Sequence, residues 1–228
     1  MTSRRLLIAA ACLMPLSAVA APLTITTVEN PPLSYMDPNT REVIGTVTEV
    51  VKQVLAKAGV GYRVEILPWQ RAYKMGLEEP NTCVYSTVVT DERKPLFKWV
   101  APIATDNWVF YGAPDSAITR KTLEDAKSYK IGGYQGDAKT VYLTAQGYTL
   151  DATSQDVLNI KKLTTHHIDL WVTSERAGLA LAEREGVTNL KKLLVFKEVL
   201  MGLACNKGTP DDVIAKLSEA LKQVPLAK

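Results

Sequence analysis

The sequence predicts an α/β protein in which strands and helices alternate around a parallel sheet. Residues 23–28 (LTITTV) alternate as a strand, and residues 62–67 alternate again. Between them, residues 45–58 carry apolar side chains three and four positions apart, which is typical of one face of a helix. The order strand, helix, strand is that of a βαβ unit.

The first residues have the pattern of an export signal. Arg4 and Arg5 precede an apolar run, residues 6–14, and the small residues at 18–20 form an A-x-A cleavage pattern. We therefore expect residues 1–20 to be a signal peptide. The run is far shorter than the ~20 apolar residues that span a membrane, and no later segment is continuously apolar over that length.

The charge of the chain argues against nucleic-acid binding. The chain has 27 Lys and Arg against 24 Asp and Glu, and two of the basic residues lie in the predicted signal peptide. The other basic residues are dispersed among acids, so no basic patch is predicted. The exported chain is long enough for one large domain or for two lobes of about 100 residues each.

The first strand ends in a loop with two consecutive prolines, Pro31 and Pro32, which force an extended backbone. Tyr35 follows, and it either leans over a ligand at this edge of the sheet or shields the core of its own loop. A helix is then predicted from Pro68, with Trp69 and Arg71 near its start. Trp69 is either a core anchor or a half-exposed indole in a cleft.

Residues 83–89 are predicted to form a buried strand that leads into a short helix. Thr90 is its expected N-cap and Arg93 lies in its first turn. This places Ser86, Thr87 and Arg93 at the carboxyl end of the strand, the edge where open α/β sheets bind ligands. An arginine there can hold a carboxylate through two parallel hydrogen bonds, or it can be a surface residue that balances its acidic neighbours.

Residues 90–103, TDERKPLFKWVAPI, resemble the T-x-E-R-x-x-x-x-x-F-S-x-P-Y segment of the periplasmic solute-binding proteins of family 3. These are the amino-acid-binding components of ABC importers. The resemblance covers nearly all of the exported chain, in order. It implies that Arg93 holds the α-carboxylate of the ligand. The P-W-x-R-A segment at Pro68 is similar to that of a subgroup of the family.

The resemblance also implies the fold, the type II periplasmic binding fold with a ligand cleft between two α/β lobes. We expect a discontinuous lobe one, residues 21–105 and 200–228, and lobe two at residues 106–199. The two connections near 104–107 and 199–205 would then act as a hinge. The strands that carry Cys83 and Cys205 are expected to be neighbours, which favours a disulfide; the alternative is two buried thiols.

Lobe two is expected to begin with strand residues from Trp108 and a capping box at residues 122–125. A further strand at 130–134 leads to Gly136, which allows a tight turn, and to a helix whose first amides form an anion site. The resemblance implies that this site faces Arg93. Asp137 stands where the family has Ser or Thr, so it either repels a bound carboxylate or caps the helix and points away.

Residues 157–163 are a predicted helix, and residues 168–172 resemble the I-D-A segment of the family. Ser174 stands where many members have an aspartate for the ligand's amino group, so this pocket is incomplete unless Glu175 substitutes. His166 and His167 have no partners at metal-ligand spacing, so no metal and no catalytic histidine is predicted. Helices at 175–185 and from Pro210, with strands at 193–196 and 199–205, complete the chain.

The predicted function is the capture of a small polar solute, an amino acid or a related carboxylate, by hinge closure in the periplasm. We expect a monomer without cofactor that delivers the solute to an ABC permease. The predicted ligand-binding residues are Arg93, Trp69, Tyr35, Arg71, Ser86, Thr87, Gly136, Asp137, Ser174 and Glu175. One alternative is an enzyme on the same scaffold, similar to cyclohexadienyl dehydratase, with Asp137 or Glu175 as base. Another is a ligand-sensing partner of a second protein.

Overall fold

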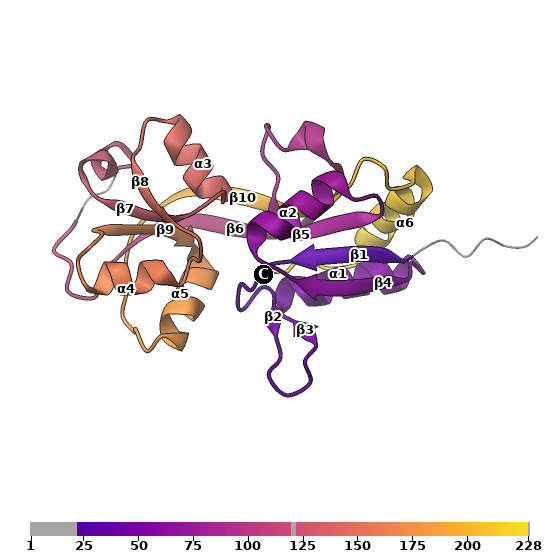
Figure 1. Cartoon of the computed structure of the whole chain (residues 1–228), viewed down its shortest axis with the longest axis horizontal. Helices are drawn as coiled ribbons and strands as arrows, with labels where there is room; N and C mark the ends of the chain where they lie inside the picture. Colours follow the sequence, from indigo (N-terminus) through magenta and orange to yellow (C-terminus); the bar gives the residue numbers. More distant parts are fainter. Residues whose placement is uncertain (1–21, 120–121, 228) are drawn as a thin grey trace, which may run out of the picture.

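The computed structural model describes residues 22–119 and 122–227 of the chain. The predicted signal peptide, residues 1–20, lies outside these ranges. Figure 1 shows two α/β halves side by side, joined by two long strands. The predicted fold class is therefore confirmed. Among the described residues there is no helix with the length and apolar character of a membrane span.

The first half is built around three parallel strands. The strand β1 (Leu23–Thr27) pairs with β4 (Tyr62–Ile66) on one side and with β5 (Thr82–Val88) on the other. The helices α1 (Thr46–Lys57) and α2 (Trp69–Glu78) connect these strands, and α1 buries the apolar stripe that predicted it. A short hairpin, β2 (Tyr35–Met36) and β3 (Val43–Ile44), projects from this half in Figure 1.

The second half repeats the same plan. The strand β7 (Ile131–Tyr134) pairs in parallel with β8 (Leu150–Thr153) and with β9 (Leu170–Ser174). The helices are α3 (Ala138–Ala145), α4 (Leu158–Thr164) and α5 (Glu175–Arg184), with a 3₁₀ turn, η2 (Glu124–Ser128), before β7. Buried apolar side chains form separate clusters, one group mainly in each half, so each half has a core of its own.

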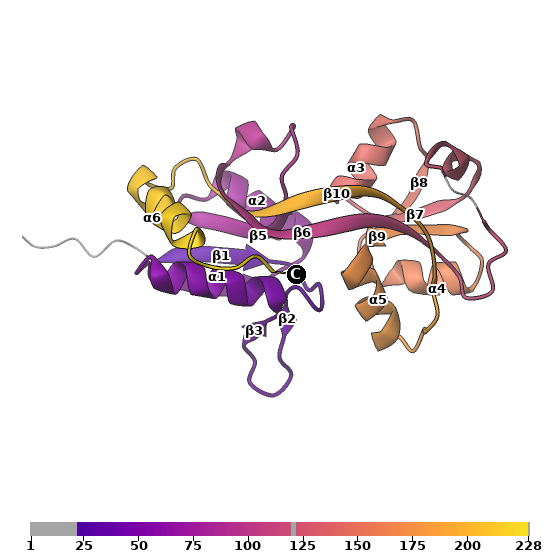
Figure 2. The ribbon, with the colours of Figure 1, turned by 180° about the vertical axis from the view of Figure 1, so that it is seen from behind.

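The two halves are connected by β6 (Lys98–Gly112) and β10 (Lys191–Cys205). These strands are antiparallel and remain paired from Cys205 opposite Lys98 to Lys191 opposite Gly112. In the first half β10 also pairs with β5, and in the second half β6 also pairs with β9. One eight-stranded sheet, in the order β4-β1-β5-β10-β6-β9-β7-β8, therefore runs through the whole molecule (Figure 2).

The structure corrects two expectations. The sequence indicated separate strands at 193–196 and 199–205, but β10 is one strand because Lys197 and Glu198 pair with Trp108 and Asn107 of β6. The segment after β5 is a turn at residues 91–93 followed by a 3₁₀ turn, η1 (Lys94–Leu96), instead of a helix from Asp91. The helix α6 (Asp211–Leu221) follows Pro210, and Ala227 returns to bridge Ala104 in β6.

Cys83 of β5 and Cys205 at the end of β10 form a disulfide. They are direct partners in the antiparallel register, with Cα atoms 3.9 Å apart and sulfur atoms 2.10 Å apart. The bond joins residues 122 positions apart in the sequence, so it closes a loop that contains the entire second half. It ties the end of the returning strand to the core of the first half.

Reducing this disulfide should destabilise the protein substantially. A closed loop of roughly 100 residues contributes about 4–5 kcal/mol by restricting the unfolded chain. We expect a lower urea midpoint for the reduced protein and for the Cys83→Ala/Cys205→Ala variant, measured on ligand-free protein. The double variant should not respond to reductant. Equal midpoints before and after reduction, with both thiols shown to be free, would contradict the assignment.

Candidate functional site

A small cavity of about 60 Å³ lies between the two halves and is lined by residues from both. It borders the carboxyl ends of β1, β5 and β7, the usual place of ligand sites in α/β sheets. Two larger hollows share lining residues with it. One of about 580 Å³ lies against α3 and the loop after β5, and one of about 670 Å³ lies against the loop after β4. Small-molecule sites typically measure 300–1,000 Å³.

Arg93 faces this cleft, where its guanidinium lies over two neighbouring aromatic rings, whose centroids are 5.3 Å apart. The guanidinium carbon is 5.3 Å from the ring centroid of Trp69 and 5.1 Å from that of Tyr73. Trp69 and Tyr73 are four positions apart on α2, so they share a helix face. Such cation–π contacts orient a guanidinium and stabilise it by about 0.5–2 kcal/mol each. Trp69 is 6% exposed and belongs to an apolar cluster, so it is both a core residue and a cavity wall.

The carbonyl oxygen of Gly136 is where the two halves meet. It accepts a hydrogen bond from the indole nitrogen of Trp69 at 3.1 Å and a long one from Arg93 at 3.5 Å. The Tyr134 hydroxyl also accepts from the backbone N–H of Trp69 at 3.3 Å. Gly136 has φ +74°, a conformation that glycine adopts without strain. The expected tight turn therefore aims a carbonyl, and not an amide, at Arg93.

Asp137 is the N-cap of α3. One carboxyl oxygen, Oδ1, accepts from the backbone N–H of Lys139 at 2.9 Å and also lies 2.9 Å from the Lys139 ammonium. Burial disfavours the charged form of both side chains, but the attraction between the two opposite charges is stronger. The pKa of Asp137 is therefore lowered and the pKa of Lys139 is raised. Asp137 therefore caps the helix, as one sequence alternative had it, but it does not point away from the cavity. The pair is neutral as a whole, and both residues line the cavity.

Two aspartates that the sequence analysis did not select also line the cavity. Asp156 accepts from the Trp171 indole at 2.8 Å, from Asn159 at 3.0 Å and from Thr173 at 3.1 Å. Asp106, on β6, is 7% exposed, and its Oδ1 has no hydrogen-bond partner among the described residues. Burial raises the pKa of both. The sequence does contain a signal for Asp106: it is an acid within the otherwise mostly apolar segment 99–111. An unpaired charge in such a segment is costly, so an acid there indicates a specific role.

Ser86 and Ser174 also line the cavity, at the ends of β5 and β9. The buried Ser86 hydroxyl has no partner among the described residues, and its backbone has φ +57°, a strained conformation for a residue other than glycine. Local strain of this kind is concentrated at ligand sites. The structure thus brings together Trp69, Arg93, Ser86, Asp137 and Ser174, with Gly136 at the neighbouring hollow.

Four of the predicted site residues lie outside the cavity as described. Tyr35 pairs with Ile44 in the hairpin, and Arg71 is exposed on α2. Thr87 follows Ser86 in the strand and therefore points to the opposite face, where its hydroxyl donates to the Val84 carbonyl at 3.2 Å. Glu175 instead accepts from Asn107 at 2.8 Å and pairs with Lys192 at 2.7 Å.

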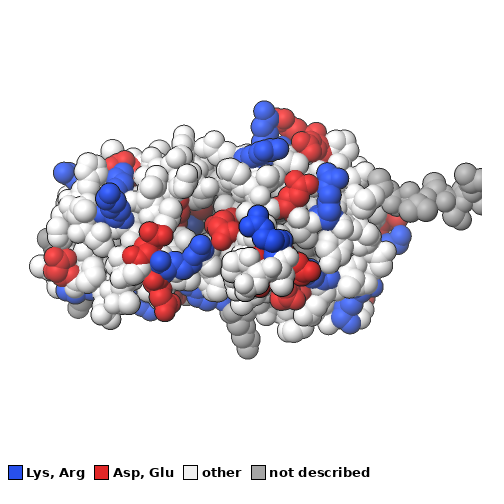
Figure 3. Space-filling view, turned by 60° about the horizontal axis from the view of Figure 1, so that its bottom comes forward, with Lys and Arg blue, Asp and Glu red and all other residues white. Residues whose placement is uncertain are grey.

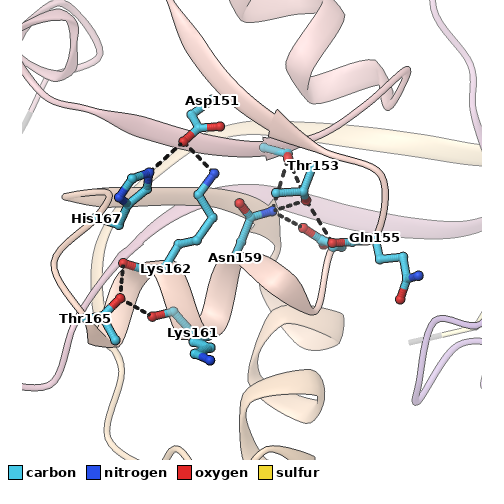
Figure 4. Close-up of polar contacts among 10 residues, drawn as sticks. Asp151, Thr153, Gln155, Asn159, Lys161, Lys162, Thr165 and His167 are labelled. Carbon is cyan, nitrogen blue, oxygen red and sulfur yellow. Dashed lines mark hydrogen bonds and ion pairs between the residues drawn. The ribbon is translucent and has the colours of Figure 1, made fainter.

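The two histidines are exposed residues of the second half. His166 lies 3.2 Å from Asp115, and His167 lies 3.5 Å from Asp151. Figure 4 shows Asp151 between His167 and Lys162, whose ammonium is 2.5 Å away. Within the described ranges, no three His, Cys, Asp or Glu residues are placed to hold a metal ion. On the face drawn in Figure 3, acidic and basic side chains are interspersed.

Comparisons with known proteins place this fold. No family model matches the sequence, and no curated protein matches it. A histidine kinase sensor domain with similarity to periplasmic binding proteins superposes with a TM-score of 0.81 at 17% identity, covering 89% of both chains. The arginine-bound form of truncated ArgBP from T. maritima gives 0.77 at 17% identity, covering 88% of this chain and 95% of that one.

The arginine-, lysine-, histidine-binding protein ArtJ from the thermophilic bacterium Geobacillus stearothermophilus also matches. Its TM-score is 0.77 at 18% identity, with 89% of each chain covered. Identities at this level establish the fold and leave the ligand open. The neighbours are binding and sensor proteins, and the fold that the sequence resemblance implied is the one observed: the chain has the two-lobed fold of the periplasmic binding proteins.

Proposed function

We propose that this protein captures a small polar solute in the cleft between its two halves by hinge closure. One observation carries the proposal: buried polar groups from both halves and from the connecting strand β6 converge on one cavity. Arg93 and Ser86 come from the first half, Lys139 and Asp156 from the second, and Asp106 from β6. Buried polar groups are normally paired, so unpaired ones at the boundary of two lobes favour a ligand.

The connection between the halves supports closure as the mechanism. The pairing of β10 with β6 contains register shifts at Val195/Lys197 and at Met201/Leu203, on both sides of the crossing. Such bulges let paired strands bend without loss of the whole ladder. The polar contacts across the cleft are those of Trp69 and Arg93 with Gly136, that of Trp69 with Tyr134, and an Arg184–Glu29 ion pair at 3.3 Å. Tyr134 and Ala138 also pack against apolar clusters of the first half. Bending at β6 and β10 would break them and open the cavity.

The solute would be an amino acid or a related compound. The central cavity alone is too small for one, so a bound solute would extend into an adjoining hollow or hold the halves slightly farther apart. Among the neighbours, ArgBP was captured with arginine, and ArtJ is described as binding arginine, lysine and histidine. Together with the export signal and the resemblance at residues 90–103, this favours periplasmic delivery of the solute to an ABC permease by a monomeric protein.

Two other functions could use the same cleft. The sensor-domain neighbour favours a sensing function, in which the closed protein docks to a signalling partner. Of the two carboxylates that the sequence offered as the base of an eliminating enzyme, Asp137 is paired with Lys139 and Glu175 lies outside the cavity. Binding is therefore the function that the geometry supports best. Turnover of a prephenate-like substrate by the purified protein would decide for the enzyme.

Solute binding should stabilise and compact the protein. A ligand at 100 times its Kd adds about 2.7 kcal/mol to the free energy of unfolding, which for a chain of this size raises Tm by roughly 5–10 °C. Thermal-shift measurements with amino acids, organic acids and polyamines should therefore identify the solute. Small-angle X-ray scattering should then show a smaller radius of gyration with it. Binding without any change in scattering would contradict hinge closure.

The variant Arg93→Ala should lose this ligand-dependent stabilisation. It removes the contact with Gly136 and the cation that lies over the rings of Trp69 and Tyr73. Arg71→Ala is the matched control, because it removes the same charge from an exposed position of α2, outside the cavity. Isothermal titration with the solute should show wild-type affinity for the control. Wild-type affinity for Arg93→Ala as well would remove Arg93 from the binding site.

A further inference from the structure

Asp106 lies where the chain crosses from one half of the molecule to the other. It is in the middle of β6, opposite Val199 of β10. Its side chain is more than nine-tenths buried, it lines the central cavity, and its Oδ1 finds no hydrogen-bond partner within the described parts of the chain. Hydrogen bonding by the Ser174 side chain and the Asn107 backbone favours the charged carboxylate. A buried carboxylate oxygen without a donor is nevertheless destabilising, so Oδ1 calls for a further group.

The other charged groups of the cavity already have partners. The Lys139 ammonium is 2.9 Å from Asp137, and Asp156 accepts three hydrogen bonds from its own half. Arg93 lies over two rings and donates to a carbonyl. Each of these groups therefore already has a contact of its own. Oδ1 of Asp106 is a buried carboxylate oxygen that has none among the described residues.

The cations around Asp106 do not fill this gap. Arg176, at the start of α5, donates to the Thr105 carbonyl oxygen at 2.8 Å, and Glu29 at the rim is paired with Arg184. Burial raises the pKa of Asp106, although hydrogen bonding by Ser174 and the charges of Lys139 and Arg176 oppose the rise. A water molecule would satisfy a hydrogen bond at Oδ1 but would leave the negative charge uncompensated. A cation from outside would do both.

The space beside Asp106 fits such a group. A cavity of about 60 Å³ can hold an ammonium or the end of a guanidinium, with the buried hydroxyl of Ser86 as a second acceptor. The rest of the solute would extend into the hollow of about 580 Å³, which shares Val88, Arg93 and Ala138 with the cavity. Aromatic side chains of Tyr73, Trp108 and Tyr142 line that hollow.

We propose that Asp106 is the acceptor for a positively charged group of the solute, so that this cleft selects amines or guanidines. The inference rests on the proposed solute-binding function and narrows it. It assigns cation recognition to the hinge strand, in place of Glu175, which lies outside the cavity. A carboxylate on the solute is compatible with this assignment but is not needed for it.

The test compares probes that differ in the cation. Wild-type protein is titrated calorimetrically with L-arginine, L-lysine, agmatine and putrescine, and with glutarate and N-acetyl-L-glutamine, which carry no cationic group. We expect at least one of the first four to bind and the last two not to bind. The isosteric variant Asp106→Asn should weaken binding of the amine at least ten-fold, because it keeps the shape of the site and removes the charge.

Glu175→Gln is the matched control. It neutralises a carboxylate that is bonded to Asn107, the residue after Asp106, but lies outside the cavity, so amine affinity should stay within two-fold of wild type. A second measurement separates a binding role from a structural one. Because the folded-state pKa of Asp106 is raised, its ionised form disfavours folding at neutral pH. Ligand-free Asp106→Asn should therefore have a higher Tm than wild type at pH 7, and this advantage should shrink as the pH falls toward 4.

The outcomes distinguish this inference from the broader proposal. Binding of glutarate or N-acetyl-L-glutamine in place of the amines would overturn it and leave solute capture intact. Unchanged amine affinity in Asp106→Asn, or a lower ligand-free Tm in that variant at pH 7, would also overturn it. If neither these six probes nor the wider solute screen binds the wild-type protein, solute capture fails, and the assignment of Asp106 fails with it.

Discussion

The pairing of β6 with β10 is the constraint on which the rest of the structure depends. These two strands carry the chain out of the first half and back, and their ladder spans both halves without interruption (Figure 2). In the first half β10 also pairs with β5, and in the second half β6 also pairs with β9. The parallel strands of the two halves therefore lie on opposite sides of the middle of the ladder. The cleft, the hinge and the placement of Asp106 all follow from that pairing. The disulfide at its first-half end fixes the returning strand to β5.

Local elements could be predicted from the sequence because their periodicity is local. The apolar stripe of α1, the alternation of β1 and β4 and the capping of α3 by Asp137 each depend on a few neighbouring residues. The continuity of β10 could not be predicted in this way, since the charged residues Lys197 and Glu198 interrupt its apolar pattern. These two residues are part of the strand because they pair with Trp108 and Asn107 of β6, which are distant in the sequence.

The same limit explains which site residues could be found from the sequence. Arg93 and Trp69 lie near the ends of elements and match a motif, and Asp137 stands at a motif position where the family has Ser or Thr, so all three could be selected without coordinates. Ser86 and Thr87 could not be told apart, because adjacent strand residues face opposite ways and the sequence does not say which face is the cleft. Asp156 was missed because its role depends on donors from Asn159, Thr173 and Trp171, which only the folded second half brings together.

Arg93 illustrates how closure and recognition can use one side chain. Its bond to the Gly136 carbonyl is 3.5 Å long, at the limit of a hydrogen bond, whereas a carboxylate would offer a shorter, charge-assisted one. A solute carboxylate could therefore replace Gly136 at little cost, while the two rings keep the guanidinium oriented. On the opposite side, Asp106 is buried with one carboxyl oxygen that has no donor among the described residues, at a cost in stability that a cationic group would relieve. These groups disfavour the closed form when no ligand is bound and stabilise the closed form when the solute is bound. Closure would therefore depend on the solute.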